Sequence, residues 1–469
     1  MSNSSLGRMV IIGGGPGGYE AARTARQLGA EVVLIEESGI GGNAVLTDVV
    51  PSKTLIAAAE AAQQIELAKS LGLGFSHDGK KINPHVEVDL GAMNNRLLSL
   101  AQSQSQQMRS VLMREGVEVI DARAKLDGNH HVVFDQAGKQ VRLEAKTIIV
   151  AVGASPRELP DAKTDGIRIL NWKQLYSLNE LPEHLIVVGS GVTGAEFASA
   201  YLQLGSKVTL VSSRDNVLPG NDHDAAELLE KVFISSGMNL LKKVRATRVI
   251  SNDSSVEVHL SDGQVLSGSH CLMAVGATPN TKGLGLEEAG VKLAEDGRVI
   301  VNKVARTSRA NVYAVGDCST SIPLASVSSM MGRTAVYHTL GDVATPTRQR
   351  NVASNVFTNP EIAQVGWSEQ EIKEGLVRGE IHQVMLDSNP RAKMQGLSEG
   401  FIKLFASTGS GTVIGGVVVA PKASDLIYPI AVAIENRLTV DQLAKTYTVY
   451  PSLSASIAEA ASALHPAID

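Results

Sequence analysis

Aromatic residues and cysteines are scarce in this sequence of 469 residues. Phe, Trp and Tyr together make up 4% of the chain, and only two cysteines occur, Cys271 and Cys318. Two isolated cysteines build no disulfide framework and form no CxxC metal-binding pattern. The sequence therefore predicts no metal site, and redox chemistry in this chain would need an organic cofactor.

Long apolar runs and clustered charges are also missing. Apolar stretches such as VIGGVVVAP (413–421) fall well short of the roughly 18 residues that a membrane span needs. The formal net charge of −5 is spread along the chain, which argues against nucleic acid as a partner. The polar start MSNSSLGR has no apolar signal core. We therefore expect a soluble, cytoplasmic protein of about three domains, at ~150 residues each.

A strand, a glycine turn and a helix open the chain in RMVIIGGGPGGYEAARTARQLGAEVVLIEE (8–37). Gly13, Gly15 and Gly18 supply the spacing G-x-G-x-x-G, which permits a tight turn and brings backbone N–H groups close to a pyrophosphate. Glu36 ends the next strand, where a carboxylate accepts the ribose hydroxyls of an adenosine. The alternatives are an ordinary glycine-rich loop and a solvated surface acid.

The same design returns in HLIVVGSGVTGAEFASAYLQLGSKVTLVSSR (184–214), with glycines at 189, 191 and 194. Here Ser212, Ser213 and Arg214 follow the second strand, so no acid stands at the ribose position. Hydroxyls and a guanidinium bind a 2′-phosphate that a carboxylate would repel. This pattern favours NADPH as the substrate. The alternative is that Arg214 is merely exposed in a loop, in which case the enzyme would use both NADH and NADPH.

Three further apolar strands end in glycine turns, in TIIVAVGASP (147–156), CLMAVGATPN (271–280) and NVYAVGDCST (311–320). Each is also compatible with an ordinary buried strand. The third adds Asp317 directly after Gly316, and an acid there suits a polyol such as the ribityl chain of FAD.

The order of these motifs, with GG…PSK (41–53), FTNPEIAQVG (357–366) and YPSLSAS (450–456), resembles the flavoprotein disulfide reductases over nearly the whole chain. That family includes dihydrolipoamide dehydrogenase and glutathione reductase, and the chain also resembles its actinobacterial branch of NAD(P)H:quinone reductases. The resemblance implies an α/β protein with two doubly wound Rossmann-type nucleotide-binding domains, for FAD and NAD(P), and a C-terminal α+β dimerisation domain. It also implies a homodimer whose active sites borrow residues from the partner. The implied domains are residues 1–155 and 286–348 for FAD, 156–285 for NAD(P), and 349–469 for dimerisation.

The resemblance also assigns roles to residues. Those that would hold FAD are Gly13, Gly15, Gly18, Glu36, Gly42, Lys53, Asp317 and the backbone near Ala325. Those that would hold NADPH or NADH are Gly189, Gly191, Gly194, Ser212, Arg214 and Gly276. Lys53 would sit by flavin N5 and pair with Glu196, whereas the residues alone allow both to be merely solvated.

The chain departs from the family at two places. The family reads GG-x-C-x-x-x-x-C-x-P-S-K, but this chain has Ala44 and Val49 at the cysteine positions. The family's C-terminal His-Pro-Thr-x-Ser-Glu is replaced by a motif with Tyr450 and Ala455 at the His and Glu positions. His465-Pro466 reproduces nothing of that motif and is interpreted as a terminal tail. Without thiols, an acid/base near neutral pKa has no function.

These departures predict an FAD-dependent NAD(P)H dehydrogenase that passes two electrons to a quinone or a similar acceptor without a redox disulfide. One alternative is a pyridine-nucleotide transhydrogenase, and another is a non-catalytic partner protein that keeps FAD as a structural group. The catalytic residues would be Lys53, Glu196 and Tyr450. Tyr450 would donate a hydrogen bond near the acceptor or would only pack where the histidine stood.

Overall fold

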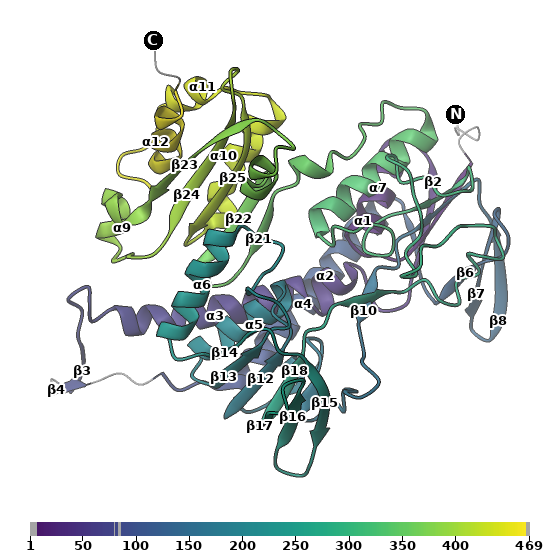
Figure 1. The fold of residues 1–469 in the computed structure, drawn as a ribbon. Coiled ribbons are helices and arrows are strands. Elements are labelled where there is room, and N and C mark those ends of the chain that lie inside the picture. The colour runs from purple at the N-terminus through teal and green to yellow at the C-terminus, as the bar shows by residue number, and fades with distance from the viewer. Residues whose placement is uncertain (1–6, 79, 83–85, 466–469) are drawn as a thin grey trace. The chain divides into compact units, whose positions relative to one another are not determined.

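The computed structural model describes residues 7–78, 80–82 and 86–465, and the chain folds into two compact units (Figure 1). Unit 1 consists of Met1–Thr54, Ala92–Arg157 and Gly276–Thr347. Unit 2 consists of Leu55–Gly91, Glu158–Val275 and Arg348–Asp469. The chain therefore leaves unit 1 and returns to it twice.

The core of unit 1 is a five-stranded parallel sheet in the order β20-β9-β1-β2-β5. Its strands are β1 (Arg8–Ile12), β2 (Glu31–Glu36), β5 (Glu118–Asp121), β9 (Thr147–Val150) and β20 (Val312–Ala314). They are rich in Val and Ile because helices and loops bury the sheet on both faces. On α1 (Pro16–Gln27) and α7 (Ala325–Leu340), the backbones meet at Gly17 and Gly332, where a Cβ on Gly332 would collide with the Gly17 carbonyl.

A three-stranded meander, β6-β7-β8, and a two-stranded pair, β10-β19, complete the strands of unit 1. The bounds of these strands and of the helices that enter the unit are β6 (Ala124–Leu126), β7 (His131–Gln136), β8 (Lys139–Glu144), β10 (Ala154–Pro156), β19 (Ala277–Pro279), α2 (Gly42–Leu46), α3 (Val49–Leu67) and α4 (Leu90–Arg114).

Unit 2 holds a second parallel sheet, in the order β11-β18-β12-β13-β14, and a second meander, β15-β16-β17. The bounds are β11 (Ile169–Leu170), β12 (His184–Val188), β13 (Lys207–Val211), β14 (Asn239–Leu241), β15 (Ala246–Ser251), β16 (Val256–Leu260), β17 (Val265–Gly268), β18 (His270–Met273), α5 (Val192–Gln203), α6 (His223–Ser235) and the 3-10 turn η1 (Leu175–Ser177). A short hairpin, β3 (Phe75–His77) and β4 (Lys80–Ile82), also belongs to this unit.

The C-terminal part of unit 2 is an antiparallel sheet in the order β21-β22-β25-β24-β23, with its own apolar core against α10 and α12. The bounds are β21 (Ser354–Val356), β22 (Glu361–Gly366), β23 (Gly379–Met385), β24 (Phe401–Ser407), β25 (Val413–Ala420), α8 (Glu369–Lys373), α9 (Pro390–Met394), α10 (Ala423–Glu435), α11 (Val440–Ala444), α12 (Ala455–Ala463), η2 (Gln349–Asn351) and η3 (Leu386–Ser388).

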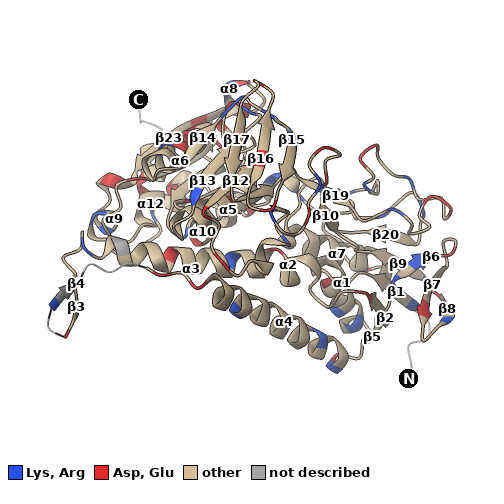
Figure 2. Ribbon diagram, turned by 90° about the horizontal axis from the view of Figure 1, so that it is seen from below, with Lys and Arg blue, Asp and Glu red and all other residues tan. Residues whose placement is uncertain are grey.

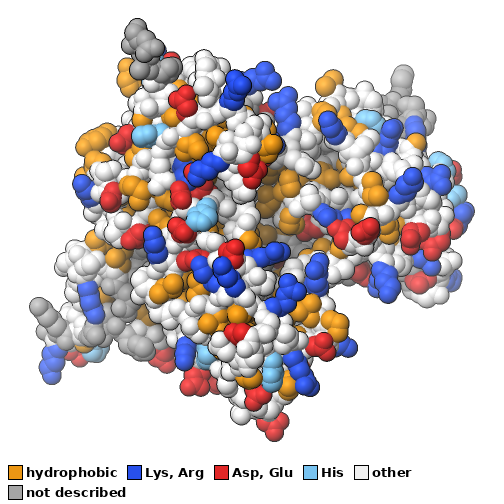
Figure 3. Space-filling model, in the orientation of Figure 1, with side chains coloured by type: hydrophobic (Ala, Val, Ile, Leu, Met, Phe, Trp, Pro, Cys, Tyr) orange, Lys and Arg blue, Asp and Glu red, His pale blue; other side chains and the backbone are white. Residues whose placement is uncertain are grey.

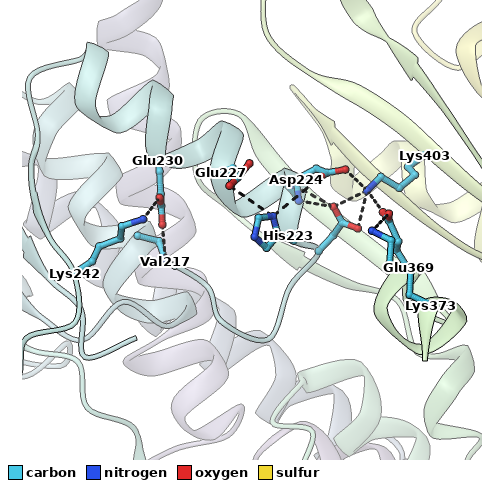
Figure 4. A network of polar contacts seen from close by, with 11 residues as sticks. Val217, His223, Asp224, Glu227, Glu230, Lys242, Glu369, Lys373 and Lys403 are labelled. Carbon is cyan, nitrogen blue, oxygen red and sulfur yellow. Dashed lines mark hydrogen bonds and ion pairs between the residues drawn. The ribbon is translucent and has the colours of Figure 1, made fainter. Parts of the chain in front are cut away.

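A buried lysine on the antiparallel sheet of unit 2 contacts the start of α6 and helix α8 (Figure 4). The side chain of Lys403 on β24 is 1% exposed, and its Nζ lies 3.0 Å from Asp222, 2.7 Å from Asp224 and 2.5 Å from Glu369. Asp222 is the N-cap of α6, where its side chain accepts hydrogen bonds from the backbone of Asp224 and Ala225. The lysine therefore bridges three converging carboxylates and links the start of α6 to the antiparallel sheet.

The expected fold class is confirmed, because two doubly wound parallel sheets precede an α+β C-terminal part. The four domain bounds expected from the sequence stay a prediction. Basic and acidic residues are interspersed along the elements of both units (Figure 2). Among the described residues, no helix combines the length and apolar character that crossing a bilayer requires.

Candidate nucleotide-binding sites

The first glycine turn links β1 to α1 with almost no free space at two of its three glycines. Gly13 has φ +103°, and a Cβ there would collide with the Ala151 carbonyl, while a Cβ on Gly18 would collide with the Gly13 carbonyl. Gly15, by contrast, has open space beside it and is the N-cap of α1, with no side chain capping the helix. The first N–H groups of α1 and its positive dipole are thus offered to an anion.

Glu36, at the end of β2, is hydrogen-bonded to the backbone of this turn. Its carboxylate accepts hydrogen bonds from the backbone N–H of Gly14 at 2.5 Å and of Ser38 at 2.7 Å. These bonds fix the acid beside the turn, where the resemblance placed an adenosine ribose. The start of α2 also approaches the turn, since a Cβ on Gly42 would lie 3.0 Å from the Gly15 Cα.

Asp317 and the start of α7 offer the groups that the rest of FAD requires. Burial, followed by the charge of nearby Asp48, raises the pKa of the half-buried Asp317 carboxyl. Within the described ranges no residue donates a hydrogen bond to this carboxyl, so it can accept one from a polyol hydroxyl. Helix α7 begins at Ala325 after Leu324 without a side-chain cap, which leaves backbone N–H groups for a flavin edge. The residues of unit 1 therefore fit FAD. Asp48 stands inside the segment from Gly41 to Lys53, but nothing in its sequence context pointed to it.

The segment that carries two cysteines in the resembling family folds as α2 and the start of α3. Ala44 lies on α2, and Val49 is the exposed first residue of α3, one helical turn before the half-buried Lys53. Neither residue has a redox-active atom. Cys271 and Cys318 are fully buried, and burial raises the pKa of both thiols, that of Cys318 to about 11. They do not replace the missing pair, as the sequence indicated.

The second glycine turn, between β12 and α5, repeats the geometry of the first. Gly189 has φ +111° and its Cβ would collide with the Ala274 carbonyl, while a Cβ on Gly194 would collide with the Gly189 carbonyl. Gly191 again has open space beside it and N-caps α5 without a side-chain cap. Gly276 has φ +100° and open space beside it. The same physical demands thus select the same glycines in both halves of the chain.

Glu196 lies on α5 and is almost completely buried. Its carboxylate accepts a hydrogen bond from the backbone N–H of Phe357 at 2.9 Å. Lys53 and Glu196 belong to different units of the chain, and their pairing stays a prediction.

The residues that follow β13 form a tight turn around Ser212. The hydroxyl of this fully buried serine accepts a hydrogen bond from Ser190 Oγ at 2.7 Å, and it also bonds both the carbonyl and the N–H of Arg214. The side chains of Ser213 and Arg214 are exposed. Ser212 therefore shapes the turn, and Arg214 is presented outward. Nothing in the sequence pointed to Lys243, whose backbone N–H donates to the Arg214 carbonyl at 3.2 Å.

Tyr450 lies in an irregular segment, residues 445–450, in which every residue is exposed. Exposed hydrophobic side chains of the protein also appear in small groups among charged ones in Figure 3. The ring of His465, which the sequence assigned to a terminal tail, lies 2.5 Å from the Asp441 carboxylate on α11. The remainder of that tail, from Pro466 onward, lies outside the described residues.

Comparisons with known proteins agree over nearly the whole chain. Residues 7–332 match the family described as pyridine nucleotide-disulphide oxidoreductase, and residues 352–461 match its dimerisation domain. An NAD(P)H dehydrogenase (quinone) of Mycobacterium tuberculosis is 48% identical over 464 residues, which cover 97% of this chain and 93% of that protein. A dihydrolipoyl dehydrogenase of Zymomonas mobilis is 30% identical and covers 96% of each chain. The crystal structure of LpdA from M. tuberculosis has a TM-score of 0.92 at 47% identity and covers 98% of this chain and 100% of that one.

Proposed function

The chain belongs to the pyridine nucleotide-disulphide oxidoreductase family, which uses FAD and NAD(P)H, and we propose that it is an NAD(P)H dehydrogenase that reduces quinones by two electrons. One observation carries the proposal: both glycine turns are complete, while Ala44 and Val49 stand where the family's thiols belong. The name of the M. tuberculosis relative supports it. A cytoplasmic location is part of the same proposal, since the enzyme would draw on the NAD(P)H pool there.

When bound, FAD supplies a two-electron carrier that takes hydride from NAD(P)H and reduces an acceptor. The chain's own residues bind and orient the reactants. The uncapped start of α1 would hold the pyrophosphate, Asp317 would accept a hydrogen bond from the ribityl chain, and the uncapped start of α7 would offer N–H groups to the flavin. Ala44 and Val49 would give this place an apolar lining, which suits a planar acceptor held by stacking and few polar contacts.

Lys53 and Glu196 are proposed to act as a pair at the reacting edge of the flavin. Lys53 lies one turn from the start of α3, on the same helical face as Val49. The hydrogen bond from Phe357 fixes the buried carboxylate of Glu196. An ammonium held by a rigid acid would keep its position as charge develops on the flavin.

The functional form is proposed to be a homodimer. The dimerisation domain and the exposed segment 445–450 support this, because exposed aromatic side chains are enriched where proteins associate. Tyr450 of the partner subunit would lie near the acceptor. Its phenol would donate a hydrogen bond to a quinone oxygen, which helps most as negative charge appears there.

Anaerobic stopped-flow mixing tests the proposed function. Enzyme reduced by NADPH or NADH is mixed with a panel of quinones, with thio-NAD⁺, with lipoamide and with oxygen. We expect the flavin to be reoxidised fastest by a quinone. Reoxidation by thio-NAD⁺ faster than by any quinone would establish a transhydrogenase instead, and failure of both nucleotides to bleach the flavin would establish a non-catalytic protein.

Tyr450→Phe keeps the ring and removes the hydroxyl, and Tyr447→Phe is the matched control in the same exposed segment. We expect Tyr450→Phe to leave hydride transfer into FAD unchanged and to slow quinone reoxidation roughly ten-fold, the equivalent of about 1.4 kcal/mol. Equal rates for the two variants would show that Tyr450 only packs in this segment.

A further inference from the structure

The two parallel sheets repeat the same hydrogen bonds around the ribose position, so they can be compared residue by residue. In the first sheet the N–H of Gly13 donates to the carbonyl before Glu36, and the N–H of Ala122 donates to the carbonyl of Glu36 itself. In the second sheet the N–H of Gly189 donates to the carbonyl before Ser212, and that of Val244 to the carbonyl of Ser212. Ser212 therefore occupies the structural position of Glu36.

The neighbouring strand differs at this position as well. In the first sheet one residue, Asp121, stands opposite Glu36, and the next residue is Ala122. In the second sheet the N–H of Ser212 donates to the Leu241 carbonyl, so that Lys242 and Lys243 fill the interval before Val244. A bulge of one residue is thus present only in the second sheet. Glu36 and Asp121 at the carboxyl edge of the first sheet therefore correspond to Ser212 and the pair Lys242 and Lys243 in the second sheet.

The two lysines have different surroundings. Lys242 forms an ion pair with Glu230 at 2.7 Å, and Glu230 also accepts from the backbone N–H of Val217 (Figure 4). Lys242 is therefore used to hold the loop that follows β13. Lys243 has φ +61°, a conformation that few residues other than glycine adopt, and its side chain is 72% exposed.

Lys243 is placed beside Arg214 by the backbone of both residues. Its N–H donates to the Arg214 carbonyl at 3.2 Å, and its Nζ lies 3.2 Å from the exposed carboxylate of Asp215. The turn around Ser212 and the bulge at Lys243 thus present two cations at the edge where an adenosine ribose binds. The exposed carboxylate of Asp215 would compete with a bound phosphate for Lys243.

We propose that Lys243 is a specificity-determining residue that binds the 2′-phosphate of NADPH together with Arg214. This inference rests on the proposed function only in that the enzyme uses NAD(P)H. Ser212 leaves room for the phosphate because it replaces an acid and directs its own hydroxyl into the turn. Asp215 weakens the site by pairing with Lys243.

The test measures inhibition constants of adenosine 2′,5′-bisphosphate and 5′-AMP against NADPH in the FAD-loaded enzyme. These two probes differ only in the 2′-phosphate. Lys243→Asn removes the charge while keeping a residue type that tolerates positive φ. We expect Lys243→Asn to raise the inhibition constant of the bisphosphate about ten-fold, because one exposed charge contact is lost. The inhibition constant of 5′-AMP should stay unchanged. Lys243→Arg should restore most of the affinity.

Lys207→Asn is the matched control, since Lys207 is exposed at the opposite end of β13. Asp215→Asn should strengthen bisphosphate binding, and raising the salt concentration should narrow the difference between Lys243→Asn and wild type. Equal bisphosphate affinity in Lys243→Asn and Lys207→Asn would overturn the proposal, as would equal losses for both probes in Lys243→Asn. Because neither probe reaches the acceptor, these outcomes are independent of whether quinones are reduced.

Discussion

Replacing Lys403 by methionine tests whether the buried ion cluster holds unit 2 together. Methionine keeps most of the side-chain volume and removes the ammonium. Asp222 and Glu369 would then remain largely buried, with side chains 5% and 20% exposed, and would lose their common partner. Breaking a buried ion pair from one side costs about 3–5 kcal/mol, because the remaining charge is left uncompensated.

The cost falls mainly on Asp222, because Glu369 keeps its ion pair with Lys373 at 2.6 Å. Asp224 is about half exposed, and an ion pair of this kind contributes about 0.2–1 kcal/mol. We therefore expect Lys403→Met to lower the free energy of unfolding of unit 2 by about 3–5 kcal/mol. Urea denaturation followed by circular dichroism measures this change. High salt should change it little, because buried charges are weakly screened.

A second substitution separates the charge of Asp222 from its role as a helix cap. Asp222→Asn removes a charge but keeps the N-cap of α6, since asparagine caps as well as aspartate. In the Lys403→Met background it should recover at least about 1 kcal/mol, the coupling expected of interacting neighbours. In the wild-type background, Asp222→Asn should not raise the free energy of unfolding. A loss below about 1 kcal/mol for Lys403→Met, or no recovery in the double variant, would refute the electrostatic explanation.

The pH dependence follows from the pKa shifts within the cluster. Burial alone would lower the pKa of Lys403, but its bonds to Asp224 and Glu369 and the charge of Asp222 outweigh burial and raise it. Burial alone would raise the pKa of Glu369, but Lys373 and Lys403 outweigh it and lower that pKa. The contribution of Glu369 is thus present above its unfolded pKa of about 4.3 and is lost as the pH falls. The destabilisation caused by Lys403→Met should therefore shrink in acid.

Three further predictions concern the cofactor and substrate sites. Asp317→Asn should weaken FAD retention, measured by equilibrium dialysis, but should raise the Tm of the flavin-free protein at pH 7. The raised pKa of Asp317 means that its ionised form destabilises the folded state at any pH above the unfolded pKa. A lower Tm for the variant would contradict this prediction. Lipoamide and glutathione disulfide should show no appreciable NADPH-dependent reduction, since Ala44 and Val49 carry no thiol; robust turnover by pure enzyme would disprove it. Arg214→Gln should lower kcat/KM for NADPH about ten-fold, with little change for NADH, through loss of an exposed charge contact; equal losses would show that Arg214 does not contact the 2′-phosphate.

Local patterns in the sequence determined the two glycine turns, the strands before them and the absence of a redox disulfide. These features depend on a few consecutive residues. A tight turn against a neighbouring backbone excludes any Cβ at Gly13 or Gly189, and the chemistry of Ala44 and Val49 is the same in any fold. The α/β class followed for the same reason, since alternating strands and helices produce parallel sheets.

The tertiary structure alone decided which distant residues share a site. Lys243 lies beside Arg214 only because β13 and β14 are neighbours in the sheet and a bulge shifts their register. Lys403 meets Asp222 across 181 residues of sequence, in a strand that otherwise reads as apolar. The buried position of Ser212 likewise depends on Ser190 in the preceding turn. Sequence periodicity reports which face of an element is buried, but strand order and register, which result from packing of the whole chain, decide what that face contacts.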